Sequence, residues 1–558
     1  MGSPDRVTTA PRAQVPSDPA GARRPLAPVP PRARQYAVRM RDGVALATDV
    51  YLPQGTGPWP VLVARLPYDK AGDECFMPAV ARWFVDRSYA VVVQDVRGKV
   101  RSAGTFVPYT NEAVDGYDTL DWAAHQPWSC GDIGMIGDSY YGFTQWAAAA
   151  SAHPALRAIT PRVCSTDFQS ALTAGGVLQL ESLVCWAAET WIDEALYDVE
   201  DRLDWSTRPL SMLISRAVGG LSSPGLDDLI LNGAPPGMKV PATGHVPGLH
   251  LGGFADILLG GQLQTWREAR TGSSPQYLIL DHTDHGWTPL RSPHEPFNDP
   301  TTTAVAMNRF LEHYLGPLLP FLDHFVRHHG AYDEPPVRWR AGRDQTWRAT
   351  TDWPPPSAQE QTWYLNGGSQ SGQLSRHQPV TQEEVSWTHR PEDPVPSRIH
   401  PYYPHIAPVD ESANQSREDV LSFSTEVLER GLLLAGPVRL DALLSSESVD
   451  THLIVTLYDV FEDGSWHRIT EGATHVTGPW PAPCRVQLND AGYLVQPGHG
   501  LVVTVSSSSF PRYVLHPGTS EDPWIATTTA ERQQLLWLGG PHGATLTCHV
   551  EPEEMSAR

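Results

Sequence analysis

A serine lies in a short stretch that is typical of the turn on which serine hydrolases carry their nucleophile. The stretch from Gly134 to Gly142 reads Gly-Met-Ile-Gly-Asp-Ser-Tyr-Tyr-Gly, and it lies between a strand-like run and a helix-like run. On such a strand–turn–helix the hydroxyl of Ser139 stands clear of the sheet, close to the amides at the start of the helix. The second glycine follows Ser139 by three residues rather than the usual two. The motif is weak alone, and its context favours a nucleophile.

A nucleophilic serine needs a general base, and the base needs an orienting acid. In α/β-hydrolases these residues follow the chain order serine, acid, histidine. The apolar runs 246–252 and 277–281 are followed by Asp256 and by His285, respectively. Because the carboxyl ends of parallel strands meet at one edge of a sheet, we expect both side chains near Ser139. Asp256 and His285 therefore stand where the acid and the base belong.

Other residues compete for these two positions. His282 precedes His285 in the same loop, and Asp284 competes with Asp256. An aspartate after a strand is also often a helix cap. The chain contains 22 His, and most of them are expected on the surface or in structural positions. Ser139, Asp256 and His285 together support the prediction of a serine, an acid and a base better than any one of them does.

The elements around these residues predict an α/β fold. Alternating apolar and polar residues from Tyr36 onward indicate a β-hairpin. The continuous apolar runs 61–66 and 89–96 have the length of buried strands, and the helical stretch 76–87 lies between them. Such alternation indicates a mainly parallel sheet that is covered by helices on both faces.

Changes in composition divide the chain into parts. Residues 1–34 hold eight Pro and six Arg, which predicts a disordered arm; a docked tail is the alternative. Residues 35–164 and 241–333 form the predicted α/β-hydrolase domain, and the helical insertion 165–240 is predicted to be its cap. Residues 334–558 alternate short β runs with Pro, Gly and Ser turns, which predicts an all-β jelly roll, a form of β-sandwich.

Composition limits the classes of partner. The 558 residues carry a formal net charge of −22, which argues against nucleic acid and anionic membranes as main partners. No apolar stretch reaches about 18 residues, so we expect no membrane span. The six Cys are scattered without a Cys-x-x-Cys pair, so we expect neither a disulfide scaffold nor a zinc site. We expect a cytoplasmic protein without metal or cofactor, and the sequence leaves a homodimer open.

Several motifs match those of a known family. They are Arg65-Leu66-Pro67-Tyr68-Asp69-Lys70, Asp95-Val96-Arg97-Gly98, Asp115-Gly116-Tyr117-Asp118 and Gly252-Gly253-Phe254-Ala255-Asp256. With these motifs and the Ser-Tyr-x-Gly turn, the chain from about Tyr36 to about Glu551 resembles the cocaine esterase and X-Pro dipeptidyl-peptidase family of serine hydrolases. That family also includes α-amino acid ester hydrolases and glutaryl acylases.

The resemblance implies a role for each matching residue. It makes Ser139 the nucleophile, Asp256 the orienting acid and His285 the general base. The oxyanion hole of the family combines a tyrosine hydroxyl with the amide after the nucleophile, which here are the Tyr68 hydroxyl and the Tyr140 N–H. Two such donors would stabilise the negative charge that develops in the transition state.

The chain also departs from the family pattern. The family's base loop reads Gly-Pro-Trp-x-His, whereas this loop runs Asp-His-Thr-Asp-His from Asp281 to His285. The surroundings of the base therefore differ. Asp138 adds a negative charge directly before the nucleophile, and inside the pocket it would raise the pKa of His285. We expect Asp138 to face solvent.

Three aromatic side chains are candidates for the wall of the substrate pocket. Phe254 lies beside the predicted acid, and Trp186 and Trp191 lie in the predicted cap. Tryptophans at such positions more often belong to a helical core. The segment 181–204 is rich in acids, and we expect it to form a solvated face.

The predicted function is the hydrolysis of an ester or amide bond in a small-molecule substrate through an acyl-serine intermediate. Acyl transfer or cyclisation would use the same residues, with an amine or alcohol replacing water. An X-Pro dipeptidyl peptidase is a further alternative, although members of that branch tend to carry an extra N-terminal helical domain. The last alternative is a binding protein that has kept the fold without catalysis.

Overall fold

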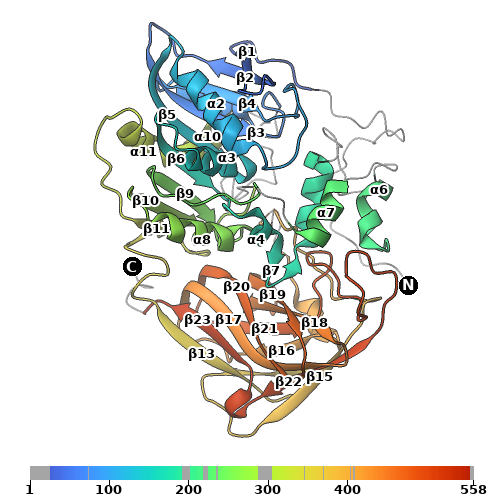
Figure 1. Ribbon diagram of the computed structural model, residues 1–558. Helices are drawn as coiled ribbons and strands as arrows, with labels where there is room; N and C mark the ends of the chain where they lie inside the picture. Colours follow the sequence, from blue (N-terminus) through green and yellow to red (C-terminus); the bar gives the residue numbers. More distant parts are fainter. Residues whose placement is uncertain are drawn as a thin grey trace.

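The computed structural model describes most of the chain in two domains, drawn blue to green and yellow to red in Figure 1. The described residues are 26–72, 75–191, 202–217, 224–233, 237–286, 304–344, 346–368, 370–402, 404–405 and 409–552. Residues 1–25, most of the expected disordered arm, lie outside this set.

A ten-stranded mixed sheet forms the centre of the first domain. Its strands, in spatial order, are β1 (Arg34–Arg39), β2 (Ala45–Tyr51), β4 (Ala90–Asp95), β3 (Trp59–Leu66), β5 (Ser129–Asp138), β6 (Leu156–Arg162), β9 (Gly248–Gly253), β10 (Gln276–Asp281), β11 (Val337–Trp339) and β12 (Arg348–Thr350). Neighbours from β4 to β11 pair in parallel, and the flanking pairs are antiparallel. The predicted mainly parallel sheet is confirmed.

Helices cover both faces of this sheet. They are α1 (Met77–Val85), α2 (Glu112–Ala124), α3 (Ser139–Ala150), α8 (Leu259–Ala269), α10 (Ala304–Leu315) and α11 (Leu318–Phe325). Along β3, Val61 and Val63 share a core with α2 and α3, whereas Leu62 and Ala64 share one with α1, α10 and α11. Because both faces are buried, the strand is continuously apolar from Val61 to Ala64 rather than alternating.

The insertion between β6 and β9 forms the cap. Its described elements are α4 (Phe168–Leu172), β7 (Thr173–Ala174), β8 (Val177–Leu178), α5 (Leu180–Trp186), a π-helical turn (Ala187–Trp191), a 3₁₀ turn (Leu210–Met212), α6 (Leu213–Ala217) and α7 (Pro224–Asn232). The short hairpin between β7 and β8 was not predicted. At its tip the carbonyl of Gly175 accepts a hydrogen bond of 2.8 Å from the N–H of His475, so the cap contacts the second domain.

The second domain is all β, as predicted. Its strands are β13 (Gln359–Asn366), β14 (Ser371–Ser375), β15 (Glu383–His389), β16 (Leu421–Ser424), β17 (Leu432–Ser446), β18 (Asp450–Val460), β19 (Trp466–Thr477), β20 (Ala482–Val495), β21 (Gly500–Ser506), β22 (Arg532–Leu538) and β23 (Thr545–Val550). They form one continuous curled sheet around an apolar core.

Two segments lie differently from the sequence-based domain boundaries. Strands β11 and β12 fall within 334–558, but they extend the sheet of the first domain because Val337–Trp339 pairs with β10. At the other end, residues 26–33 are docked rather than disordered. The N–H of Ala27 donates to the carboxylate of Asp69 over 2.8 Å, and Arg101 donates to the carbonyl of Ala27.

Two kinds of feature are absent from the described residues. No helix among them is long and apolar enough to cross a membrane. Within the same residues, no cluster of three or more His, Cys, Asp or Glu side chains is arranged to hold a metal ion.

Candidate active site

The turn between β5 and α3 holds Ser139 in a strained backbone conformation. Strand β5 ends at Asp138 and helix α3 begins at Ser139, whose φ is 51°. Positive φ is uncommon for residues other than glycine, and it occurs where surrounding structure enforces a functional geometry. Gly137 has a φ of 141°, and a Cβ there would lie 2.1 Å from Cδ2 of Tyr141. The turn therefore requires glycine two residues before Ser139.

The late glycine of the motif has a packing reason. A Cβ on Gly142 would lie 2.7 Å from Sγ of Cys164 and 3.0 Å from the carbonyl oxygen of Arg162. Helix α3 thus passes very close to the end of β6, and only glycine fits at this point of contact. The Ser-Tyr-Tyr-Gly spacing follows from where α3 crosses its neighbouring strand.

Three predicted side chains are joined by hydrogen bonds at the carboxyl edge of the sheet. Asp256 follows β9, and its Oδ2 lies 2.7 Å from Nδ1 of His285, which follows β10. Nε2 of His285 lies 3.1 Å from Oγ of Ser139. Asp256 is 1% exposed, and its other oxygen accepts the N–H of Leu258 over 2.6 Å. The arrangement is that of a serine, a base and an orienting acid.

The charge balance around His285 raises its pKa. Burial alone would lower it, but the negative charge of Asp256 and the hydrogen bond to Asp256 outweigh burial. Asp138 and Asp284 add smaller effects in the same direction. The imidazole is therefore a stronger base than an isolated histidine, which suits the removal of a proton from a hydroxyl.

The competing residues lie elsewhere. The ring of His282 packs against the ring of His405 with centroids 4.4 Å apart, and it lines a different cavity from Ser139. Asp284 is fully buried, and its Oδ2 accepts the N–H of His405 over 3.3 Å. Neither side chain joins the hydrogen-bonded chain at Ser139.

The expectation that Asp138 faces solvent is wrong. Asp138 is 7% exposed and lines the same cavity as Ser139. Tyr314 donates a hydrogen bond to its carboxylate, and Nε of Arg162 lies 3.9 Å from its Oδ1. As the last residue of a central strand that is covered on both faces, Asp138 faces the cavity and not the outer surface of the protein.

Ser139 and His285 line a cavity of about 200 Å³ whose walls include many aromatic side chains. The aromatic lining residues are Tyr68, Phe76, Tyr109, Tyr141, Phe143, Phe168, Trp186 and Tyr402. The indole N–H of Trp186 donates to the hydroxyl oxygen of Tyr68 over 3.3 Å. Two predicted residues, Tyr68 and Trp186, are therefore in contact beside the nucleophile.

Of the other two pocket candidates, the structure places only Phe254. Phe254 is buried on the far side of its turn, where its ring packs 5.3 Å from that of Trp353. A Cβ on Gly492 would lie 2.2 Å from this ring, so Phe254 fits against β20 of the second domain. Assigning Phe254 to the substrate pocket was therefore wrong. The side chain of Trp191 lies outside the described part of the chain, as do many acids of the segment 181–204.

A buried network holds the residue after the nucleophile. The hydroxyl of Tyr140 donates to Oε1 of Glu112 over 2.9 Å and accepts the N–H of Tyr109 over 2.8 Å. Nη1 of Arg65 lies 2.8 Å from the other oxygen of Glu112. Burial raises the pKa of Glu112, and the charge of Arg65 opposes this effect. Fixed at its far end, the Tyr140 side chain restrains the backbone that carries its N–H.

Tyr402 is a site residue that was not predicted from the sequence. It lies in the connection from β15 to β16, yet its ring centroid is 5.2 Å from that of His285. Its hydroxyl donates to the carbonyl of Ser182 over 2.5 Å, and its own carbonyl accepts the N–H of Gly286 over 3.3 Å. The only local signal is an aromatic pair between two prolines. The second domain thus supplies one wall of the cavity.

Comparison with known proteins agrees with this architecture. Residues 42–287 match the family model described as X-Pro dipeptidyl-peptidase (S15 family), and residues 329–547 match the X-Pro dipeptidyl-peptidase C-terminal non-catalytic domain. The chain is 31% identical over 540 residues to the cocaine esterase of Rhodococcus sp. (strain MB1 Bresler). The aligned region covers 86% of this chain and 91% of that relative. The chain belongs to the X-Pro dipeptidyl-peptidase (S15) family. The resemblance read from its motifs is confirmed, and this family member is a serine hydrolase that acts on ester or amide bonds.

Solved structures share the whole fold of this S15 family member. An α-amino acid ester hydrolase has a TM-score of 0.78 at 23% identity, over 97% of this chain and all of that chain. An aminopeptidase from the marine sediment archaeon Thaumarchaeota archaeon has the same TM-score at 22% identity, over 99% and 100% of the two chains. The order of an α/β-hydrolase domain and an all-β domain is therefore shared.

Proposed function

We propose that the chain is a serine esterase that cleaves small esters with an uncharged, apolar acyl group through an acyl-serine at Ser139. The observation that carries the proposal is the contact between Ser139 and His285 in an aromatic cavity. In the first step Nε2 of His285 accepts the proton of the Ser139 hydroxyl while Oγ of Ser139 attacks the ester carbonyl carbon. Asp256, hydrogen-bonded to Nδ1, stabilises the imidazolium that forms.

The negative charge on the carbonyl oxygen then needs hydrogen-bond donors. We assign this role to the hydroxyl of Tyr68 and to the N–H of Tyr140. The Tyr68 hydroxyl lines the same cavity as Ser139 and is held by Trp186, and the Tyr140 side chain is fixed by Glu112. Donors that are held in place before the reaction lose little energy to reorganisation when the charge develops.

The second half of the reaction repeats the proton transfers. The His285 imidazolium donates its proton to the leaving alkoxide, so the alcohol departs and Ser139 stays acylated. A water molecule then loses its proton to His285 and attacks the acyl carbon. The bond between the acyl carbon and the Ser139 oxygen breaks as the His285 imidazolium returns the proton to that oxygen. The carboxylic acid leaves, and the Ser139 hydroxyl is restored.

The lining of the cavity favours an uncharged acyl group. A free amine on the substrate would require a carboxylate partner, because a buried cation without one is strongly disfavoured. Asp138 is the only carboxylate among the described lining residues, and it is already engaged by Tyr314 and Arg162. The aromatic side chains instead favour an apolar group of modest size. This preference separates the proposal from an X-Pro dipeptidyl peptidase, whose substrates carry a free α-amine.

The test compares substrates that share a chromophore. The full-length protein should hydrolyse p-nitrophenyl butyrate and p-nitrophenyl phenylacetate much faster than alanyl-proline p-nitroanilide. The variant Ser139→Ala should lose at least about 10⁴-fold in kcat for each ester. Covalent labelling of Ser139 by a fluorophosphonate, measured by mass spectrometry, reports the nucleophile without any substrate.

Three results would count against the proposal. Preferred cleavage of the dipeptide anilide would favour the peptidase alternative. Transfer of the acyl group to an added amine, faster than hydrolysis, would favour acyl transfer with the same residues. Absence of both turnover and labelling would favour a binding protein without catalysis.

A further inference from the structure

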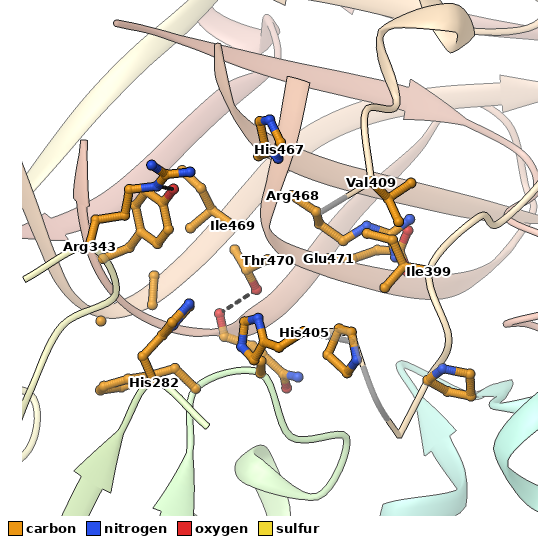
Figure 2. A pocket seen from close by; sticks show the side chains of 18 of the residues that line it. His282, Arg343, Ile399, His405, Val409, His467, Arg468, Ile469, Thr470 and Glu471 are labelled. Atoms are coloured by element: carbon orange, nitrogen blue, oxygen red, sulfur yellow. Dashed lines mark hydrogen bonds and ion pairs between the residues drawn. The ribbon is translucent and has the colours of Figure 1, made fainter. Parts of the chain in front are cut away.

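A second cavity, of about 240 Å³, lies between the two domains (Figure 2). On one side it is lined by Phe254 and Ala255 from the turn after β9 and by His282 from the turn after β10. On the other side it is lined by residues of β19 and β20. Among the described residues, none lines both this cavity and the catalytic one. The same two turns thus separate two distinct compartments.

Two of the three arginines of this second cavity are balanced by buried carboxylates. Arg468 donates to both oxygens of Glu411 over 3.0 Å and 2.8 Å, and its Nη1 lies 3.1 Å from Oε1 of Glu471. Nε of Arg512 lies 2.7 Å from the same oxygen of Glu471. Glu411 and Glu471 are both buried. These four side chains form a neutral wall, which Figure 2 shows in part, with Arg468 beside Glu471.

The third arginine lacks such a partner. Nε of Arg343 donates to the hydroxyl of Tyr493 over 3.0 Å, and its guanidinium lies 4.1 Å from the ring centroid of Phe461. No carboxylate among the described residues forms an ion pair with Arg343. Its φ of 65° is in the left-handed region, a costly conformation for a long side chain. Arg343 is exposed, and its partner Tyr493 donates to the buried carboxylate of Asp459 over 2.9 Å. One wall of the cavity therefore carries a positive charge that meets a carboxylate of the described residues only through the Tyr493 hydroxyl.

Two neighbouring imidazoles have hydrogen-bonding capacity that the protein does not use. Nδ1 of His282 and Nε2 of His405 are buried and have no hydrogen-bond partner in the described structure. Figure 2 shows both rings on the same side of the cavity, opposite His467 and Ile469. Burial lowers the pKa of His282 well below its usual value, and the positive charge of Arg343 lowers it further. Polar groups in a protein interior normally find partners, so these two nitrogens, on residues that line the cavity, leave hydrogen-bonding capacity that a ligand could use.

The remaining lining is largely apolar. It includes Phe254, Ile399, Val409, Ile469 and Ala491. A ligand that fits these walls combines an apolar body with one group that accepts hydrogen bonds and carries negative charge. A carboxylate meets both requirements, because guanidinium and imidazole N–H groups are its preferred donors.

We propose that this interdomain cavity is a binding site for a small organic carboxylate. Its anionic group lies between Arg343 and the His282 imidazole, and its apolar body packs against Ile469 and Phe254. The site is separate from the catalytic cavity, and it does not depend on the proposed esterase reaction. An occupant would contact the residues directly before Asp256 and close before His285.

The experiment measures binding rather than turnover, on the full-length protein at pH 7 by isothermal titration calorimetry. The probes are phenylacetate and phenylacetamide, which share the apolar body and differ in charge. Phenylacetate is expected to bind with a Kd of about 1 mM or tighter, and phenylacetamide at least about tenfold more weakly. Equal affinity for the two probes, or no binding of phenylacetate up to about 10 mM, would overturn the proposal.

Variants locate the site. Arg343→Gln removes the charge and is expected to weaken phenylacetate binding at least about tenfold. Ile469→Trp fills the cavity and is expected to abolish binding. Arg157→Gln is the matched control, because Arg157 is an exposed arginine of β6 that pairs with Asp132, and it should bind like the wild type. If Arg343→Gln fails to fold, Ile469→Trp decides alone. Unchanged binding in both cavity variants would place the carboxylate elsewhere and refute the proposal.

Discussion

The two cavities on either side of the β9 and β10 turns differ in how their polar groups are paired. In the catalytic cavity, Asp256, His285 and Ser139 form one continuous chain of hydrogen bonds. In the interdomain cavity, His282 has a buried ring nitrogen without a hydrogen-bond partner. Arg343 forms no ion pair with a carboxylate of the described residues. The three catalytic-cavity residues, called the paired set below, can pass protons among themselves. The two interdomain-cavity residues, called the unpaired set, satisfy their hydrogen-bonding groups and charge only when a ligand binds.

Neighbouring residues of the same turns face the two different compartments. Phe254 and Asp256 lie two residues apart. The ring of Phe254 packs against Gly492 of the second domain, while Asp256 contacts His285. His282 and His285 are divided in the same way. Residue type alone therefore does not assign a histidine or an aromatic ring to the active site; the direction of the turn does.

The largest effect is expected from breaking the paired set. Asp256→Asn leaves His285 without a carboxylate to stabilise its protonated form and favours the wrong tautomer, so kcat/KM should fall about 10⁴-fold. His282→Ala should cost less than about tenfold if the two histidines belong to different compartments. Both are measured by p-nitrophenyl butyrate hydrolysis, with the exposed His313→Gln as a neutral control. Equal losses of kcat/KM in Asp256→Asn and His282→Ala would refute the placing of His282 and His285 in different cavities.

A smaller effect is expected from the proposed oxyanion donor. Tyr68→Phe removes one hydroxyl and keeps the ring, so kcat should fall about 10²-fold while KM changes little. The split between kcat and KM separates charge stabilisation from simple packing. A change confined to KM would mean that Tyr68 shapes the pocket and does not stabilise the transition state.

The pH dependence tests the charge around His285. Because the general base must be unprotonated, kcat/KM should fall as the pH drops through the raised pKa of His285, so the acid limb lies above the ordinary histidine value of about 6.5. Asp138→Asn removes a negative charge that contributes to this rise. The acid limb of this variant should therefore move to lower pH, by less than about one unit.

The matched control for this shift is Asp86→Asn, which removes an exposed carboxylate at the end of α1. Its pH–rate profile should superimpose on that of the wild type. A shift to higher pH in Asp138→Asn would contradict the assigned sign.

The smallest effect concerns the unpaired set. His282→Phe removes a buried nitrogen that has no hydrogen-bond partner, and the ring can keep its place beside Gly342. Because such a nitrogen costs stability, the thermal midpoint of the variant should rise by about 1–2 °C. Phenylacetate binding should weaken at the same time, as expected when function requires an unfavourable residue. A lower midpoint would indicate that His282 stabilises the empty protein.

Sequence patterns predicted features that depend on local order. The turn at Ser139 and the strands before Asp256 and His285 have clear signals, and the structure brings these three side chains together. Their catalytic roles stay a prediction. The turn geometry also explains why Gly142 stands where it does.

Features that depend on tertiary contacts were missed. Strand β11 has only three residues, too few for a periodic pattern, and its place in the first sheet is set by pairing with β10. Asp138 looked like a solvent-facing charge because sequence does not show that the end of its strand is covered. The position of Tyr402 depends on how the two domains dock, which no local pattern encodes.

The position of Tyr402 has a consequence for how members of this family could diversify. One wall of the catalytic cavity is encoded far downstream of Ser139, in the part of the gene that specifies the all-β domain. A recombination event that exchanged only this downstream part would leave the nucleophile, base and acid intact and yet deliver a new surface against the substrate. Chimeras joined after Thr350 would therefore inherit their chemistry from one parent and part of their substrate selection from the other.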